Sequence, residues 1–211
     1  MRSFTDRTDA GRRLARELAD RDLGESPVVL GLPRGGVPVA AEVARALSAP
    51  LDVLVVRKVG TPGQEELALG AVGEEDAVIR NDGIVRASGI SRTALAARED
   101  LERAEVERRA DMFRPNRGPV PLDGRTAVIV DDGIATGATM RAACAIARSR
   151  GAERIIVAVP VAAPDVIAEL PDADDVVCLY APEAFMAVGM HYIDFRQTQD
   201  EEVIRLLAEA G

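Results

Sequence analysis

The apolar residues of this chain follow two periods that alternate along most of its length. Short runs rich in Val and Ile are typical of buried strands, whereas longer segments with apolar residues three or four positions apart are typical of amphipathic helices. The first pattern predicts strands in residues 27–32, 51–60, 126–132, 153–162 and 174–181. The second predicts helices in residues 4–22, 36–49, 91–114, 137–151 and 164–171, and from about 199 onward.

Residues 60 to 90 interrupt this alternation. The segment is polar and contains several glycines, and its short β-like pieces at 67–72, 77–80 and 83–86 predict a β-hairpin with mobile tips. The helix that follows carries only a thin apolar stripe, so it is expected to pack on one side. That stripe consists of Leu95, Leu101, Val106, Met112 and Phe113.

Strands that alternate with helices indicate an α/β fold, in which a mainly parallel sheet is covered on both faces. The 211 residues contain no Ser-, Gly- or Pro-rich linker, so a single domain over residues 1–211 is expected. Ligands of such sheets bind at the carboxyl ends of the strands. Three loops with unusual chemistry are predicted there, at residues 32–36, 57–63 and 131–139.

Composition and charge argue against several classes of function. A net charge of −9 disfavours non-specific nucleic-acid binding, which needs a basic surface. No apolar run has the length of a membrane span, and the first residues lack the apolar core of a signal peptide, so a soluble cytoplasmic protein is expected. The single histidine, His191, cannot build a zinc cluster and is expected to be structural. Cys144 and Cys178 are expected to be free thiols.

Two adjacent acids, Asp131 and Asp132, end the predicted strand at 126–132 and precede the turn "GIATGAT". Like charges at the end of a buried strand are costly unless a partner satisfies them. The turn leads into a helix, whose N-terminal N–H groups bind phosphate. Phosphate on the turn and a diol on the acids describe a ribose 5-phosphate, and the acids could also help to hold Mg²⁺. The alternative is an ordinary strand–turn–helix connection.

Three other phosphate chemistries fail on particular residues. A Walker loop needs a Lys after its last glycine, but "GLPRGGVP" has Val37 there. A haloacid-dehalogenase-type site needs acids two positions apart, and Gly133 stands two after Asp131. A receiver domain needs a Lys further along the chain, and none follows Lys58, the only lysine among 26 basic residues.

The string "VIVDDGIATGAT" resembles the signature by which type I phosphoribosyltransferases bind 5-phosphoribosyl-1-pyrophosphate (PRPP). The resemblance implies that Asp131 and Asp132 contact the ribose hydroxyls, act in catalysis and meet Mg²⁺ indirectly, through PRPP or water. It also implies a cradle for the 5-phosphate. The residues of this cradle are Ala135, Thr136, Gly137, Ala138 and Thr139.

A second segment, "LPRGGVPVA", looks like the pyrophosphate loop of the same family, with Arg34, Gly35 and Gly36 as donors. That loop often contains a cis peptide bond, which is expected here between Pro33 and Arg34. Arg57 and Lys58 match basic residues that flank the pyrophosphate, and we expect both to be catalytic.

The resemblance covers most of residues 28 to 180 and is closest to uncharacterised stand-alone phosphoribosyltransferases. It implies a doubly wound core at about 24–180, a mobile hairpin at about 60–90 that closes over the site, and a small hood at about 180–200 completed by the N-terminal segment. It further implies a Mg²⁺-dependent transferase of nucleotide metabolism that binds PRPP and a small nitrogenous acceptor and forms a homodimer.

The acceptor is not identified by these residues. Enzymes that use 6-oxopurines carry an acid at the position of Ala135, and they carry a lysine on the next strand, which this chain lacks. An anionic or intrinsically nucleophilic acceptor is therefore favoured. The hood is expected to contact it through Tyr180, Glu183 and Phe185, although the aromatic residues there could instead fill a local core. Two other functions stay open, a non-catalytic sensor of PRPP or a nucleotide and a PRPP hydrolase.

Overall fold

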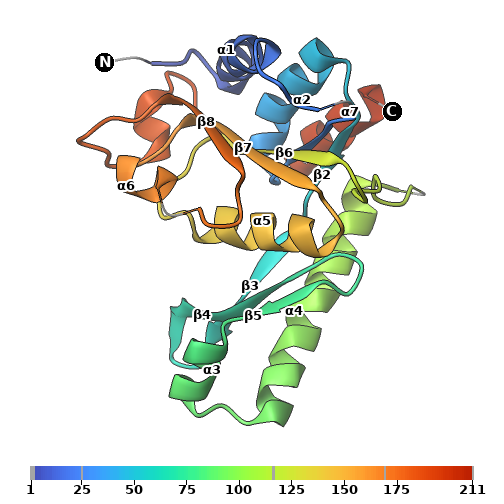
Figure 1. Cartoon of the computed structure of the whole chain (residues 1–211), viewed down its shortest axis with the longest axis vertical. Coiled ribbons are helices and arrows are strands. Elements are labelled where there is room, and N and C mark those ends of the chain that lie inside the picture. Colours follow the sequence, from blue (N-terminus) through green and yellow to red (C-terminus); the bar gives the residue numbers. More distant parts are fainter. Residues whose placement is uncertain (1–2, 25, 116, 169, 211) are drawn as a thin grey trace.

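The computed structural model describes residues 3–24, 26–115, 117–168 and 170–210. Its centre is a five-stranded sheet in the order β2-β1-β6-β7-β8, in which every neighbouring pair is parallel (Figure 1). This confirms the α/β class. The strands are β1 (Val28–Gly31), β2 (Leu51–Val53), β6 (Thr126–Val130), β7 (Arg154–Val161) and β8 (Asp175–Tyr180).

Helices cover both faces of this sheet, because alternate residues of each buried strand point to opposite sides. Val29 and Val128 pack with one set of helices, and Val28 and Ile129 pack with the other. The first set is α1 (Arg7–Ala19), α2 (Gly36–Leu47) and α7 (Asp200–Glu209). The second set is α5 (Ala138–Ser149) and α6 (Pro164–Ile167). The doubly wound arrangement is thereby confirmed.

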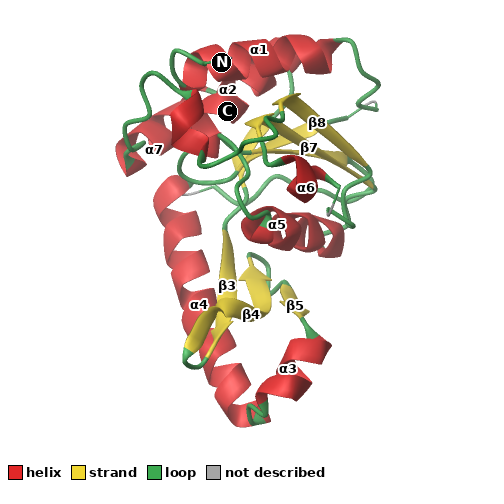
Figure 2. Ribbon diagram, turned by 90° about the vertical axis from the view of Figure 1, so that its left-hand side faces the viewer, coloured by secondary structure: helices red, strands yellow, loops and turns green. Residues whose placement is uncertain are grey.

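A smaller lobe extends from one end of the core (Figure 2). Three antiparallel strands form its sheet, and the long helix α4 runs along it and back to the core. Leu95, Val106 and Phe113 are the buried apolar residues of α4, whereas Leu101 is 70% exposed. The buried stripe of the helix is therefore narrower than predicted. The elements of the lobe are β3 (Val56–Thr61), β4 (Gln64–Gly73), β5 (Val78–Arg80), α3 (Asp82–Ser88) and α4 (Arg92–Phe113).

Two predictions about this region are wrong. The strand predicted at 51–60 is two strands, because the chain leaves the core sheet after β2 and enters the small sheet as β3. The piece at 83–86, predicted as β, belongs to α3. Asn81 caps that helix, since its side chain accepts a hydrogen bond from the backbone N–H of Ile84 at 3.2 Å.

A buried ion network joins the lobe to the core. Arg114, at the end of α4, donates to Asp52 of β2 at 2.9 Å and pairs with Glu74, which follows β4. All three side chains are buried. Asp52 also accepts from the backbone N–H of Val120 at 2.8 Å, and Glu74 from that of Val55 at 3.2 Å. The network therefore fixes the point at which the chain passes between the two sheets.

Candidate functional site

The loop after β1 and the loop after β6 touch at the carboxyl edge of the sheet. β1 and β6 are neighbours, and the N–H of Leu32 donates to the carbonyl of Val130 at 2.9 Å. A Cβ added to Gly36 would lie 2.6 Å from that carbonyl oxygen and 2.8 Å from the Cα of Asp131. Only glycine allows this approach. The peptide bond between Pro33 and Arg34 is cis, as predicted.

Asp131 and Asp132 lie side by side at this edge. The backbone N–H of Asp132 donates to Oδ1 of Asp131 at 2.8 Å. Burial, and next the charge of Asp132, raise the pKa of Asp131 well above its usual range. Burial also raises the pKa of Asp132, although Arg7 opposes that shift. Asp131 is therefore the carboxylate for which ionisation is harder, and a ligand or cation that contacts it would relieve the cost.

Arg7, in the first turn of α1, contacts the acid pair, although no pattern along the chain singled it out. Its Nε and Nη2 both approach Oδ2 of Asp132 at 2.8 Å. Its Nη1 donates to the carbonyl of Arg196 at 2.7 Å, and its guanidinium lies 4.1 Å from the centre of the Phe195 ring. One arginine thus joins the N-terminal helix, the acid pair and the segment before α7.

The turn after the acids ends on the N-terminus of α5. Ile134 anchors the turn to β7, since its N–H donates to the carbonyl of Val161 at 2.9 Å. Gly137 caps the helix with φ 73°, a conformation that glycine adopts readily. The predicted phosphate-cradle residues before and within the first turn are largely accessible: Ala135, Thr136 and Thr139 are exposed and Ala138 is half-buried.

Arg141 lies beside this turn and was not selected from the sequence. Its guanidinium donates to the carbonyl of Thr136 at 3.1 Å, and a Cβ on Gly137 would lie 2.9 Å from its Nη1. A cation next to a helix N-terminus adds to the positive potential of the N–H groups. The turn can therefore attract an anion.

The predicted pyrophosphate donors are divided between two places. Arg34 belongs to the loop after β1, and its Nη1 is 3.7 Å from a carboxylate oxygen of Asp200 on α7. Arg57 and Lys58 lie within β3, so the prediction of a third loop at the carboxyl edge of the core is wrong. The error follows from the split of the predicted strand at 51–60.

Arg57 and Lys58 point to opposite faces of β3, because successive side chains of a strand alternate. Arg57 shares a face with Val59, which packs in the cluster that contains Val106 of α4, and its Nε donates to Glu102 of α4 at 2.8 Å. Lys58 shares a face with Val56, which packs against the cluster of α5. Of the two, Lys58 is on the side of the helix that carries the phosphate turn.

The hood residues pack mainly on one another. His191 is buried, and its ring is stacked on Phe185 at 5.8 Å and edge-on to Tyr180 at 5.6 Å between centroids. Tyr192 contacts Phe4 and Phe195, and its hydroxyl donates to the carbonyl of Asp132 at 2.6 Å. These contacts favour the local-core interpretation of the aromatics. Glu183 is exposed, and its role toward an acceptor, like that of Tyr180 and Phe185, stays a prediction.

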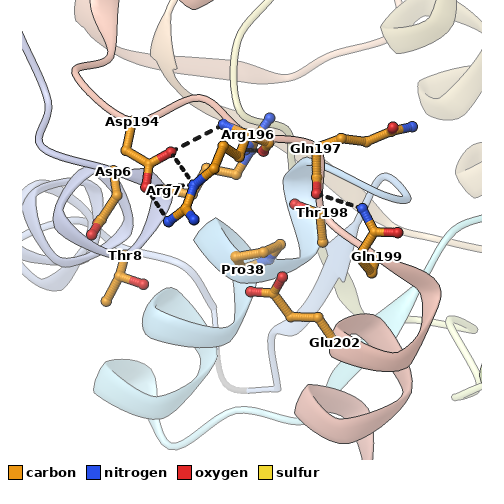
Figure 3. A pocket seen from close by; sticks show the side chains of 10 residues that line it. All are labelled: Asp6, Arg7, Thr8, Pro38, Asp194, Arg196, Gln197, Thr198, Gln199 and Glu202. Carbon is orange, nitrogen blue, oxygen red and sulfur yellow. Dashed lines mark hydrogen bonds and ion pairs between the residues drawn. The ribbon is translucent and has the colours of Figure 1, made fainter.

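Arg7 also lines a polar pocket of about 570 Å³ (Figure 3). Its walls come from the start of α1, the start of α2, the segment before α7 and α7 itself. Asp194 and Arg196 form a two-pronged ion pair there, and the hydrogen bonds from Arg196 lower the pKa of Asp194 to about 2. The remaining wall residues are Asp6, Thr8, Pro38, Gln197, Thr198, Gln199 and Glu202.

The described residues contain no group of three or more His, Cys, Asp or Glu side chains placed to hold a metal ion. Within the same residues, no helix is both long and apolar enough to cross a membrane.

Cys144 and Cys178 are free thiols, as predicted, and burial raises the pKa of the Cys144 thiol to about 12.

The phosphoribosyl transferase domain family matches residues 4–192, which include both loops, the acid pair and most of the hood. The chain belongs to this family. A protein of Mycobacterium tuberculosis strain H37Rv named "Putative phosphoribosyl transferase Rv0571c" is 54% identical over 211 residues. These residues are 100% of this chain but 47% of that protein, so the chain spans about half the length of the curated relatives it matches.

Solved structures agree with the fold of this phosphoribosyl transferase domain. The crystal structure of TT1426 from Thermus thermophilus is 45% identical, covers 99% of both chains and superposes with a TM-score of 0.90. A purine phosphoribosyltransferase from Pyrococcus horikoshii is 18% identical, with coverage of 92% and 93% and a TM-score of 0.50. The second likeness shows the fold alone.

Proposed function

We propose that this phosphoribosyl transferase domain transfers the 5-phosphoribosyl group of PRPP to a nitrogenous acceptor and releases pyrophosphate. One observation carries the proposal. The acid pair, Asp131 and Asp132, is held against the loop at 33–36 on one side and continues into the turn at 135–139 on the other. A sugar bearing a phosphate at one end and a pyrophosphate at the other matches this order of groups.

In this proposal each part of PRPP meets a different part of the edge. The amides at the start of α5, with Thr136 and Thr139, bind the 5-phosphate. Asp131 and Asp132 accept hydrogen bonds from the ribose hydroxyls and so fix the sugar. Arg34 and the backbone of the loop at 33–36 face the pyrophosphate, which leaves C1 as the acceptor nitrogen arrives from the opposite side. Positioning and stabilisation of the leaving charge supply the catalysis.

The residues at this edge could hold Mg²⁺ only together with waters and oxygen atoms of the substrate. Mg²⁺ prefers oxygen ligands and is usually bound by one or two carboxylates together with waters and substrate phosphates. Asp131 and Asp132 offer two carboxylates, and burial raises the pKa of Asp131, so a nearby cation would favour its ionised form. A magnesium ion that arrives with PRPP would supply charge neutralisation for the leaving pyrophosphate.

Ala135 restricts the choice of acceptor. It is exposed at the position where a general base would stand in an enzyme for 6-oxopurines, and its methyl group cannot accept a proton. A positioned base contributes about 10²–10⁴ in rate. We therefore propose an acceptor that is already anionic or nucleophilic, which needs no base at this position.

The test is pyrophosphate release from PRPP and Mg²⁺, measured with and without a panel of bases and small anionic heterocycles. The site variant is Asp131→Asn/Asp132→Asn. The control is Asp100→Asn, because Asp100 is a 69% exposed acid on α4, where it pairs with Arg103. Release that requires one acceptor, disappears in the site variant and persists in the control is the expected result.

Two other results would favour the two other functions. Release that does not depend on an acceptor would indicate a PRPP hydrolase. Binding of PRPP without release, with every acceptor of the panel, would favour a sensor. The homodimer and the cytoplasmic location inferred from the sequence also stay predictions. Because the chain spans about half the length of its curated relatives, the activity of a longer protein that contained it would be a separate proposal.

A further inference from the structure

Arg7 differs from the other arginines of α1. That helix also carries Arg12, Arg13 and Arg16, and the side chains of Arg12 and Arg13 are 64% and 43% exposed. The side chain of Arg7 is only 12% exposed. Arg7 is also the first residue of the helix, where the helix dipole disfavours a positive charge. A buried cation at this end must be offset by specific partners.

All three nitrogens of the Arg7 guanidinium have partners. Two nitrogens share Oδ2 of Asp132, the third donates to the carbonyl of Arg196, and one face of the group covers the Phe195 ring. The donors and the ring face are thus engaged on two segments distant in sequence. A lysine could supply the charge but not this planar set of contacts.

The contact leaves the acid pair with a defined orientation. Oδ1 of Asp131 accepts from the N–H of Asp132, and Oδ2 of Asp132 is held by Arg7. Each carboxylate is therefore held through one oxygen, which leaves its other oxygen as an acceptor for a ligand. Gly35 makes room for this arrangement, because a Cβ there would lie 2.1 Å from Oδ2 of Asp132.

We propose that Arg7 is a positioning residue for PRPP. By holding Asp132 through one oxygen, it presents the other oxygen beside Asp131, so that two adjacent ribose hydroxyls meet two pre-oriented acceptors. The inference rests on the proposed function. Pre-orientation lowers the cost of ordering side chains when the ligand binds, so Arg7 acts on affinity through Asp132 and does not itself touch the sugar.

The experiment is calorimetric titration of PRPP with Mg²⁺ into the whole chain and three variants. Arg7→Gln removes the charge and the fork, Arg7→Lys keeps the charge, and Arg13→Gln is the control. Arg13 lies on the same helix but pairs with Asp9 near the surface. Thermal melts show whether each variant is folded, and the fitted stoichiometry reports the fraction that can bind.

We expect Arg7→Gln to raise the Kd for PRPP about tenfold or more at unchanged stoichiometry, because the charge-assisted hydrogen bonds that orient Asp132 are lost. Arg7→Lys should recover part of the affinity, and Arg13→Gln should match the wild type. A purely structural role for Arg7 would lower the stoichiometry or the melting temperature and leave Kd unchanged, which would overturn the proposal. Equal Kd values for Arg7→Gln and Arg13→Gln would also overturn it. Absence of PRPP binding by the wild type would instead refute the proposed function, and this inference with it.

Discussion

The core edge and the small lobe differ in the contacts that join their elements. At the core edge, backbone packs on backbone, so that a single Cβ on Gly36 would collide with Val130 and Asp131. In the lobe, side chains pair across elements, as Arg57 does with Glu102 and Arg103 with Asp76. Partly exposed ion pairs of this kind contribute little each. This difference indicates that the edge is built for a fixed geometry, whereas the lobe is held by its buried apolar residues and by the ion network around Arg114.

The largest expected effect on stability is in the buried ion network of Arg114. Arg114→Met would leave the carboxylates of Asp52 and Glu74 buried without this cation, and removing one member of a buried ion network costs about 3–5 kcal/mol. Chemical denaturation should show this loss in the free energy of unfolding. Arg108→Met is the control, because Arg108 lies on the same helix, its side chain is 61% exposed and its partner Glu105 is 30% exposed, so it should cost far less. Equal losses in the free energy of unfolding would contradict the importance of the buried ion network.

The second prediction concerns adjacent residues of β3. Lys58→Gln should lower the rate of pyrophosphate release by about 10²-fold if it stabilises the leaving group, the usual cost of losing such a donor. Arg57→Gln, which loses its pair with Glu102, should change the rate far less. Rates are compared at saturating PRPP. A larger loss for Arg57→Gln would contradict the assignment of the two faces.

The third prediction tests the packing of the edge. Gly36→Ala should cost about 1–3 kcal/mol of stability, since the new methyl group meets the backbone of β6 and must displace it. It should also weaken PRPP binding, because the shift moves Asp131. Gly118→Ala is the matched control, as a Cβ there meets nothing within 4 Å. If Gly36→Ala is as stable as this control, the edge is less rigid than its contrast with the lobe implies.

The smallest expected effect has the opposite sign. Burial raises the pKa of Asp131 in the folded protein, so the native state binds the proton more tightly than the unfolded chain, and ionisation at higher pH destabilises the fold. Asp131→Asn removes that cost and should stabilise the protein by about 1 kcal/mol at pH 8, within the usual range of such substitutions. The gain should shrink as the pH falls through the folded pKa. It should be accompanied by loss of PRPP binding.

Most of the core could be predicted because local pattern and global position agree there. The run "TAVIVDD", its turn and the helix after it defined one part of the carboxyl edge, and the glycines of "LPRGGVPVA" marked the other. The lobe was harder. Residues 51–60 form one continuous, mainly apolar run without Gly or Pro until its end, so nothing local indicates that the chain changes sheets near Leu54.

The site shows the same limit. The acid pair carries its own signal, since two adjacent carboxylates after an apolar run need a reason. Arg7 carries none, because it is one of many arginines and its partner Asp132 lies 125 residues away. Only the packing of α1 against the core and the hood brings them together. The facing direction of Arg57 likewise depends on where α4 packs.

A crystal structure of the chain with PRPP and Mg²⁺ tests the central claim most directly. We expect the ribose hydroxyls on Asp131 and Asp132, the 5-phosphate on the amides at 135–139 and the pyrophosphate on the loop at 33–36. A sugar phosphate bound elsewhere, for example in the pocket between Asp194 and Glu202, with the acid pair left unliganded, would contradict it.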